Sequence, residues 1–454
     1  MNRSGTRTSV RRIGVRLLVV AAASMALFGP GALAGAPEIN TIRLEPGATT
    51  AEQQALIDAA MNQVGTDYVS SDNVQFIRSL KLAADGVGAR VVGNYLYVTS
   101  TKDLEIYDIS TPADPQLMGT LTLDVEFENE QVPTNGAVLG ISGQTPSLTG
   151  AGVCPSFYPT SSSGCLVIFD VRDKAHPTQV AAVQGAGDHT STCILSCTYM
   201  YGSAGSITDL RGVLGESHTA TKLATNWVAY LKSKGYPFYA GCHNQVEVRS
   251  GIILTACDPM YVLSVRKQDG ASVTTPKVLG AADYLSAPDD QKRFVHSGEW
   301  AQGGTDRIML SGGETNFQPE CGDTNGAFAT FRVGGTASKP TFTFADQVRP
   351  VAGNYLDGNP PQGTYHLGCS VHWFEPNPSF KNGGLVAMAS YENGTRFKKI
   401  DPDGKISEVG FFEPLGGSTS APHWAPDGRT VYAIDYQRGI DVLRWNGELY
   451  VPKK

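Results

Sequence analysis

A short apolar strand pattern recurs seven times along the 454-residue chain, each time after a hairpin such as VVGNYLYVTS at 91–100. Gly-Asn, Asn-Gly and Asp-Gly pairs supply the positive φ angles that tight hairpin turns need. Equivalent positions of the seven copies are Asp108, Asp170, Asp209, Ser264, Arg332, Asp401 and Arg444, a span of 336 residues in six steps with a mean of 56. A unit of this length holds three or four strands and buries its faces only against its neighbours. The repeat therefore predicts an all-β fold, a seven-bladed β-propeller.

The predicted propeller occupies residues 70–454, after an extension at 35–69. Within that extension, residues 50–64 (TAEQQALIDAAMNQV) have the period of a short amphipathic helix. We therefore expect one propeller domain with a short N-terminal helical extension.

Residues 1–34 have the features of a secretory signal peptide. They combine a basic start, a mostly apolar stretch at 17–33 and the small-residue cleavage site Ala32-Leu33-Ala34. The Arg11-Arg12 pair leaves twin-arginine export open, but its surroundings favour the Sec route. The expected location is secreted or extracytoplasmic.

Charge and hydropathy restrict the partners of the mature chain. The formal net charge is −7, and removal of the five signal-peptide arginines changes it to −12. Such an acidic protein is poorly suited to binding nucleic acid, which requires basic residues to neutralise phosphates. No later stretch has the roughly 18 apolar residues of a membrane span. We expect a monomer that binds a small molecule at the channel mouth or an extracellular protein or glycan.

The chain has eight cysteines, an even number that in an exported protein indicates disulfides. Thiolate zinc sites usually contain CxxC, which is absent here. Cys242 and Cys257 are equidistant from the predicted hairpin turn, so they should face each other across adjacent strands. The other predicted pairs are Cys193–Cys197 across a short turn, Cys154–Cys165 around a Pro/Ser/Gly-rich loop and, by elimination, Cys321–Cys369.

Two repeats carry a family resemblance. The segments GNYLYVTSTKDLEIYDISTPADPQLMG (93–119) and GCLVIFDVRDKAHPTQVA (164–181) resemble the LVIVD-repeat family of exported bacterial β-propellers. The other five repeats keep the hairpin but lose the Asp-x-x-x-Pro tail. The resemblance implies the propeller fold and an extracytoplasmic location. It implies little about activity, because a fold does not determine a function.

Five of the eight histidines stand at one recurring place, at the start of the first hairpin strand of a blade. They are His189, His243, His296, His372 and His423. The innermost strands of a propeller line its axial channel, so equivalent positions form a ring around the axis. In the first two blades this place is held by Asp85 and by Glu128 with Glu130.

Converging imidazoles with a carboxylate suit a transition metal, whereas calcium and magnesium prefer more oxygen ligands. We therefore predict a metal site formed by the five histidines and Glu130. The predicted metal is copper, with zinc and iron as alternatives. Asp188 and Glu299 either orient an imidazole, act as a general base or are solvated polar groups, and His366 is a candidate for a further ligand.

Two functions are consistent with these features. The first is an exported propeller whose channel binds a metal and supports metal-dependent oxidation of a small molecule. The second is a non-catalytic propeller that binds a protein, glycan or cell-wall partner, with histidines that close the channel by hydrogen bonding between blades. Neither the catalytic residues nor the substrate follow from the sequence. Trp300, Trp373 and Trp424 lie beside ring histidines and either wall the channel or pack between blades.

Overall fold

The computed structural model describes residues 40–44, 48–61, 63, 66–122, 130–143, 164–239, 241–282, 294–314, 326–350 and 368–450. The predicted signal peptide at 1–34 lies outside these residues. Strands make up most of the described chain, with three short α-helices at Thr50–Met61 (α1), Trp227–Ser233 (α2) and Ala301–Gly304 (α3) and a 3₁₀ turn at Lys267–Asp269. In the described residues, no helix is long and apolar enough to cross a membrane.

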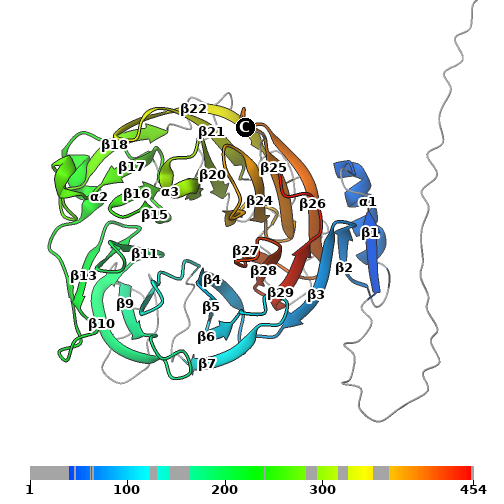
Figure 1. Ribbon diagram of the computed structural model, residues 1–454, viewed down its shortest axis with the longest axis horizontal. Helices are drawn as coiled ribbons and strands as arrows, with labels where there is room; N and C mark the ends of the chain where they lie inside the picture. Colours follow the sequence, from blue (N-terminus) through cyan, green and yellow to red (C-terminus); the bar gives the residue numbers. More distant parts are fainter. Residues whose placement is uncertain are drawn as a thin grey trace, which may run out of the picture. The chain divides into compact units, whose positions relative to one another are not determined.

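The described strands form seven sheets arranged as a ring (Figure 1). From the innermost strand outward, blade 1 contains β4 (Gly86–Val92), β5 (Tyr95–Ser100), β6 (Asp103–Asp108) and β7 (Gln116–Thr122), and blade 2 contains β8 (Val138–Gly143), β9 (Gly164–Asp170) and β10 (Thr178–Gly187). Blade 3 contains β11 (Ser191–Ile194), β12 (Tyr199–Gly202), β13 (Ile207–Gly212) and β14 (Thr219–Lys222), and blade 4 contains β15 (Gln245–Arg249), β16 (Ile252–Thr255), β17 (Met260–Ser264) and β18 (Lys277–Ala282). Blade 5 contains β19 (Phe294–Glu299), β20 (Ile308–Glu314), β21 (Phe328–Thr336) and β22 (Lys339–Val348), and blade 6 contains β23 (Phe374–Pro376), β24 (Gly384–Ala389), β25 (Thr395–Ile400) and β26 (Ile406–Pro414). The prediction of a seven-bladed β-propeller is confirmed.

Blade 7 closes the ring with strands from both ends of the described chain. Its inner strands β27 (Thr419–Trp424), β28 (Thr430–Asp435) and β29 (Gly439–Trp445) come from the C-terminal region, whereas its outer strand β3 (Val74–Leu80) comes from the N-terminal region. β3 pairs antiparallel with β29, so backbone hydrogen bonds join the two ends of the propeller.

Apolar side chains fill the spaces between neighbouring blades. One cluster joins Tyr97 and Ile106 of blade 1 to Leu139 and Phe169 of blade 2, all of them buried. Similar clusters occur between the following pairs of blades around the ring. Each blade is therefore stabilised by the burial of apolar surface against its two neighbours.

The N-terminal extension packs on blade 6. β2 (Thr66–Ser71) pairs with β26, and β1 (Asn40–Leu44) pairs in parallel with β2. The predicted helix at 50–64 is confirmed over Thr50–Met61 as α1. A capping box begins it, because Thr49 N donates to Glu52 Oε2 at 2.8 Å and Glu52 N donates to Thr49 Oγ1 at 3.3 Å. Ile57 is buried against Phe411 of β26, which fixes α1 to the sheet.

Two of the predicted disulfides are confirmed, Cys193–Cys197 and Cys242–Cys257. Cys165 and Cys369 are also disulfide-bonded, but their predicted partners Cys154 and Cys321 lie outside the described residues. Disulfides are compatible with an extracytoplasmic location.

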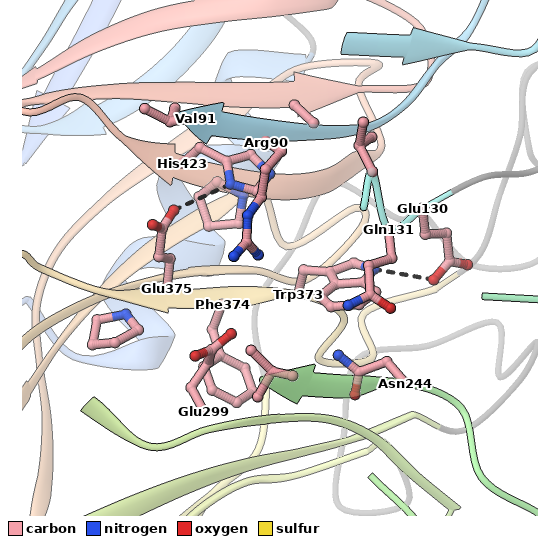
Figure 2. Close-up of a pocket in the computed structure, with 15 residues that line it drawn as sticks. Arg90, Val91, Glu130, Gln131, Asn244, Glu299, Trp373, Phe374, Glu375 and His423 are labelled. Atoms are coloured by element: carbon pink, nitrogen blue, oxygen red, sulfur yellow. Dashed lines mark hydrogen bonds and ion pairs between the residues drawn. The ribbon is translucent and has the colours of Figure 1, made fainter. Parts of the chain in front are cut away.

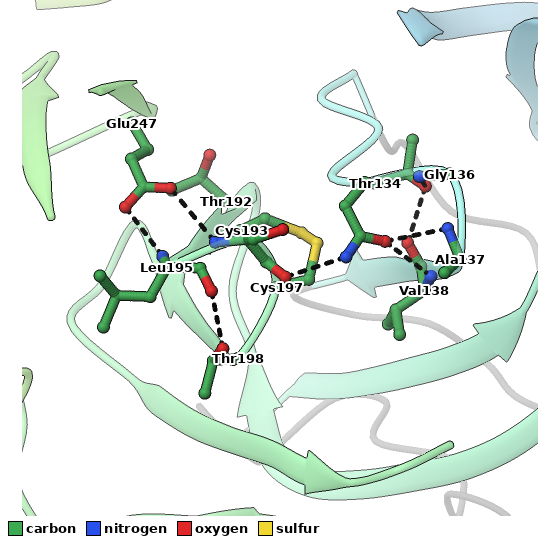
Figure 3. Close-up of a disulfide and its surroundings, with 12 residues drawn as sticks. Thr134, Gly136, Ala137, Val138, Thr192, Cys193, Leu195, Cys197, Thr198 and Glu247 are labelled. Atoms are coloured by element: carbon green, nitrogen blue, oxygen red, sulfur yellow. Dashed lines mark hydrogen bonds between the residues drawn. A yellow bond between two sulfur atoms is a disulfide. The ribbon is translucent and has the colours of Figure 1, made fainter. Parts of the chain in front are cut away.

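The Cys193–Cys197 disulfide holds the turn between β11 and β12 (Figure 3). Leu195, Ser196 and Cys197 all have positive φ angles there. Glu247 of blade 4 accepts hydrogen bonds from Leu195 N at 2.8 Å and Ser196 N at 3.4 Å, and the side chain of Asn135 donates to Ser196 O at 2.9 Å. These contacts place the turn between blade 4 and the start of blade 2.

We expect loss of the Cys242–Cys257 disulfide to lower the free energy of unfolding by about 3 kcal/mol, because it closes a 15-residue separation in the unfolded chain. The double variant Cys242→Ser/Cys257→Ser tests this in urea unfolding without reductant. The matched control is Cys193→Ser/Cys197→Ser, which opens a separation of 4 residues and should cost about 2 kcal/mol. Equal stability of Cys242→Ser/Cys257→Ser and the unaltered protein would contradict the prediction.

Candidate metal centre

Four of the five predicted histidines lie at or just before the innermost strands of blades 3 to 6. His189, His243 and His372 each stand two residues before the innermost strand of their blade, and His296 is the third residue of β19. Hydroxyl groups fix these positions between blades. Thr190 Oγ1 donates to His243 O, and Ser297 Oγ donates to His372 O at 2.9 Å. The residue after one histidine therefore holds the backbone of the histidine in a neighbouring blade.

Glu130 lies among these histidines because of the segment that carries it. Gln131, the next residue, forms a parallel bridge with Ala89 of β4. Its Nε2 donates to Thr192 Oγ1 of blade 3 at 3.1 Å and to Gln245 O of blade 4 at 2.7 Å. Gln131 thus links three blades, and this places the Glu130 carboxylate near the axis.

The Nε2 atoms of the four histidines converge on the Glu130 carboxylate. His296 Nε2 is 3.1 Å, His372 Nε2 is 3.2 Å and His243 Nε2 is 3.5 Å from Oε2, and His189 Nε2 is 3.5 Å from Oε1. His296 and His372 are fully buried, and Glu130 is 5% exposed. The rings are also close neighbours, with a centroid separation of 3.6 Å between His243 and His296 and 4.3 Å between His296 and His372.

Each histidine–Glu130 separation fits two ligand atoms of one metal ion. With metal–ligand bonds of roughly 2.0–2.1 Å, two ligands in tetrahedral positions are about 3.3 Å apart. The N···O distances of 3.1–3.5 Å in the structure lie around this value. Within the described residues, Glu130 forms one compact donor group with His189 and His243 and another with His296 and His372.

The hydrogen bonds of His372 define its tautomer. Its Nδ1 lies 2.7 Å from Ser420 O, a carbonyl that can only accept, so Nδ1 carries a proton. In neutral His372 the Nε2 lone pair therefore faces the Glu130 carboxylate at 3.2 Å. Two acceptors at this distance require a cation between them, either a proton or a metal ion.

The pKa values follow from burial and from the two carboxylates nearby. Burial, followed by the neighbouring histidines, lowers the pKa of His243 and of His296, so both imidazoles are neutral at pH 7, the form that binds metal. Burial alone would lower the pKa of His372, but Glu130 and Glu314 raise it above its usual value. Burial would raise the pKa of Glu130, yet His372, His243 and His296 hold it well below its usual value.

Glu314 and Tyr391 belong to the same centre and were not predicted. Glu314 ends β20, and its Oε2 lies 3.9 Å from His296 Nε2. Its Oε1 accepts a hydrogen bond from the Tyr391 hydroxyl, and the Tyr391 ring stacks on His372 with a centroid separation of 4.5 Å. Glu314 ends the second strand of its blade and Tyr391 lies just after another second strand, whereas the prediction concerned only the start of the first strand. Glu314 also forms a compact donor group with His243 and His296.

The structure does not bring His423 to the Glu130 centre. His423 is the fifth residue of β27, and its Nδ1 lies 3.1 Å from Glu375 Oε2. Ser420 Oγ donates to Val87 O, the same contact that Ser297 makes with His372. The ring position of blade 7 is therefore Thr419, four residues before His423, and the sequence spacing gave the wrong register for this blade.

The residues predicted to orient the imidazoles lie elsewhere. Asp188 accepts hydrogen bonds from Ala204 N at 3.1 Å and from Ser206 Oγ at 2.9 Å, so it holds a turn of blade 3. Glu299 lines a cavity next to the centre. His366 lies outside the described residues.

The three tryptophans divide between the two predicted roles. Trp373 Nε1 donates to Glu130 Oε2 at 3.0 Å, which places this indole at the centre. Trp300 and Trp424 are buried between blades, where their Nε1 atoms donate to Asp306 O and Glu375 O.

The cavity, of about 190 Å³, adjoins the Glu130 centre (Figure 2). Its lining includes Glu130, Trp373 and Glu299, and also Glu375 and His423. His423 thus shares a cavity with Glu130 although it does not contact that carboxylate in the described structure. A small molecule in the cavity would lie beside the donor group.

The comparison with protein families supports one repeat. The family model described as LVIVD repeat matches residues 87–122. The chain carries an LVIVD repeat. The matched residues correspond closely to blade 1, from β4 to β7, so one repeat is one blade. The second resembling segment, 164–181, lies outside the match.

Other comparisons add little about function. No curated protein sequence matches the chain. Two similar solved structures are titled "Structure of U3-55K" and "Crystal structure of RRP9 WD40 repeats", each 10% identical in sequence. The match to the first covers 82% of this chain and 98% of that chain with a TM-score of 0.49, and the match to the second covers 83% and 98% with a TM-score of 0.48. Likeness at this level says nothing of what this chain does.

Proposed function

We propose that this protein binds one transition-metal ion through the Nε2 atoms of His189, His243, His296 and His372 and the carboxylate of Glu130. The observation that carries the proposal is the approach of His372 Nε2 to Glu130 Oε2, at 3.2 Å, while His372 Nδ1 is held by a backbone carbonyl. A metal ion satisfies both acceptors and the other converging nitrogen atoms, whereas a single proton satisfies one pair.

Copper is the proposed metal, with zinc and iron as alternatives. Imidazole is a good ligand for all three, and for a given site the affinity of divalent metals is usually highest for copper. A donor set of four imidazoles and one carboxylate contains no thiolate, since the described cysteines are in disulfides. The proposed location of the protein is extracytoplasmic, in agreement with these disulfides.

The test is metal analysis of the protein purified without a histidine tag and then exposed to equal amounts of Cu²⁺, Zn²⁺ and Fe²⁺. We expect one equivalent of metal after desalting, mainly copper. Electron paramagnetic resonance of the Cu²⁺ form should show hyperfine coupling to several imidazole nitrogens. Protein that keeps no metal in competition with a weak chelator would overturn the proposal.

The oxidation of a small molecule stays a prediction from the sequence. The cavity beside Glu130 supports it, because a substrate there would adjoin the metal. In such a reaction the metal would supply the redox chemistry. The residues of this chain would hold the metal, exclude bulk water and position the substrate. The non-catalytic alternative predicts either metal binding without turnover of a substrate, or no metal binding and no turnover.

A further inference from the structure

The cavity beside the metal centre has walls of two kinds. Trp373, Phe374 and Pro422 contribute apolar surface, and the indole of Trp373 donates a hydrogen bond to Glu130, which also lines the cavity. Arg90 and Glu299 contribute charge from different blades, Arg90 from β4 and Glu299 from the end of β19. Ligand sites in proteins typically combine apolar walls with a few polar groups of this kind.

The side chains of Arg90 and Glu299 have no ion-pair or hydrogen-bond partner among the residues that the structure describes. Other charged groups in the cavity are already paired. Glu375 Oε2 is bound by His423 Nδ1 and by Trp424 N, each at 3.1 Å. Glu130 is surrounded by the four histidines. Figure 2 shows the Arg90 side chain extending from β4 across the view toward Glu299. The free charges of the cavity are therefore one guanidinium and one carboxylate.

Glu299 is half-buried, so water hydrates its carboxylate only in part, whereas Arg90 is exposed. Burial raises the pKa of Glu299 to about 8, the Arg90 charge lowers it and the Glu375 carboxylate raises it. A charge that is partly removed from water is tolerated best when it is paired, so a cationic group on a ligand would stabilise ionised Glu299. Arg90 is the complementary group for an anion, since its guanidinium can donate two parallel hydrogen bonds to a carboxylate.

We propose that the cavity binds a small zwitterion of the amino-acid class. The carboxylate of the ligand pairs with Arg90, its ammonium group pairs with Glu299, and its apolar side chain packs on Trp373 and Phe374. Glu130 also lines the cavity, but the residues that bind the zwitterion are outside the metal ligand set, so its binding does not depend on bound metal. In the metal-loaded protein the zwitterion lies next to the centre and is a substrate of the size that the cavity admits.

Isothermal titration calorimetry with three matched probes tests the proposal. Leucine carries both charges, 3-methylbutylamine carries only the ammonium group and 4-methylpentanoate carries only the carboxylate. We expect leucine to bind at least tenfold more tightly than either of the others. Arg90→Gln should weaken the binding of leucine and of 4-methylpentanoate about tenfold or more and leave the affinity for the amine unchanged. Glu299→Gln should weaken the binding of leucine and of the amine about tenfold and leave the binding of 4-methylpentanoate unchanged. Loss of one charge-assisted hydrogen bond accounts for a change of this size.

The control variant is Arg211→Gln, which removes an exposed arginine paired with Asp209 on blade 3 and should leave all three affinities unchanged. Melting temperatures verify that each variant is folded. The titrations are run on protein as purified and again after treatment with EDTA, so that coordination of leucine to a metal is distinguished from binding in the cavity. Loss of leucine binding after EDTA, equal binding of leucine and the amine, or no saturable binding at millimolar concentrations would overturn the proposal. Absence of metal with retained leucine binding would overturn the proposed function alone.

Discussion

Replacement of His296 and His372 by alanine is expected to abolish metal binding, whereas replacement of His423 leaves one equivalent bound. The first two residues are fully buried and place their Nε2 atoms 3.1 and 3.2 Å from Glu130 Oε2. Removing both leaves the ion with two imidazoles and one carboxylate, and the affinity should fall at least about 100-fold, since loss even of a group that only orients a ligand costs 10–100-fold. His423 contacts Glu375 instead.

Metal content is measured for His296→Ala/His372→Ala, His423→Ala and the unaltered protein, in parallel with their melting temperatures. His423→Ala is the matched control, because it removes an imidazole from the innermost strand of a blade, as the His296 substitution does. A second double variant, His296→Gln/His372→Gln, keeps more of the buried volume in case the alanine variant is unstable. Retention of metal in both double variants would contradict the geometry of the Glu130 centre. Metal loss in His423→Ala as well as in the double variants would favour the five-histidine ring derived from the sequence spacing.

The contrast between these histidines shows what the sequence could predict. The propeller, its seven blades and the hairpin with Cys242 and Cys257 follow from local patterns, namely strand periodicity and turn residues at a regular spacing. These local patterns do not determine which residue of a blade's first strand faces the channel axis at the ring position. Thr419 holds the ring position of blade 7, and nothing in its local sequence distinguishes it from the His-Trp pair four residues later.

The contribution of Glu130 depends on contacts between distant segments. Glu130 was predicted as a ligand from its place in the repeat, but its central position results from Gln131, whose side chain binds residues 61 and 114 positions away. Glu314 and Tyr391 join the centre in the same way, from outside the first strands of their blades. No repeat marks these residues, because each belongs to one blade only. A periodic pattern in the sequence can indicate a position that is equivalent in several blades. It cannot indicate a residue that contributes from one blade only.

A buried arginine far from the metal centre gives the second large expected effect. Arg396 on β25 is 1% exposed, and its Nη2 lies 2.9 Å from Glu413 Oε2 while its Nη1 donates to Gln53 Oε1 of α1 at 2.7 Å. It thus joins the N-terminal helix to blade 6. We expect Arg396→Met to lower the free energy of unfolding by about 3 kcal/mol at pH 8, because Glu413 and the neighbouring Glu392 lose a buried cation.

The pH dependence and a second variant show whether charge is the cause. Burial raises the pKa of Glu413 well above its usual value, and Arg396 lowers it, so loss of Arg396 raises it further. A carboxyl group whose folded pKa is raised destabilises the protein as pH increases toward that pKa, and the loss in Arg396→Met should therefore be smaller at pH 5 than at pH 8. Adding Glu413→Gln removes the uncompensated carboxylate and should recover much of the loss at pH 8. Arg78→Met, which breaks an exposed pair with Asp114, should cost no more than about 1 kcal/mol in the same urea titrations. An equal loss at both pH values, unrelieved by Glu413→Gln, would mean that Arg396 stabilises the fold by packing rather than by its charge.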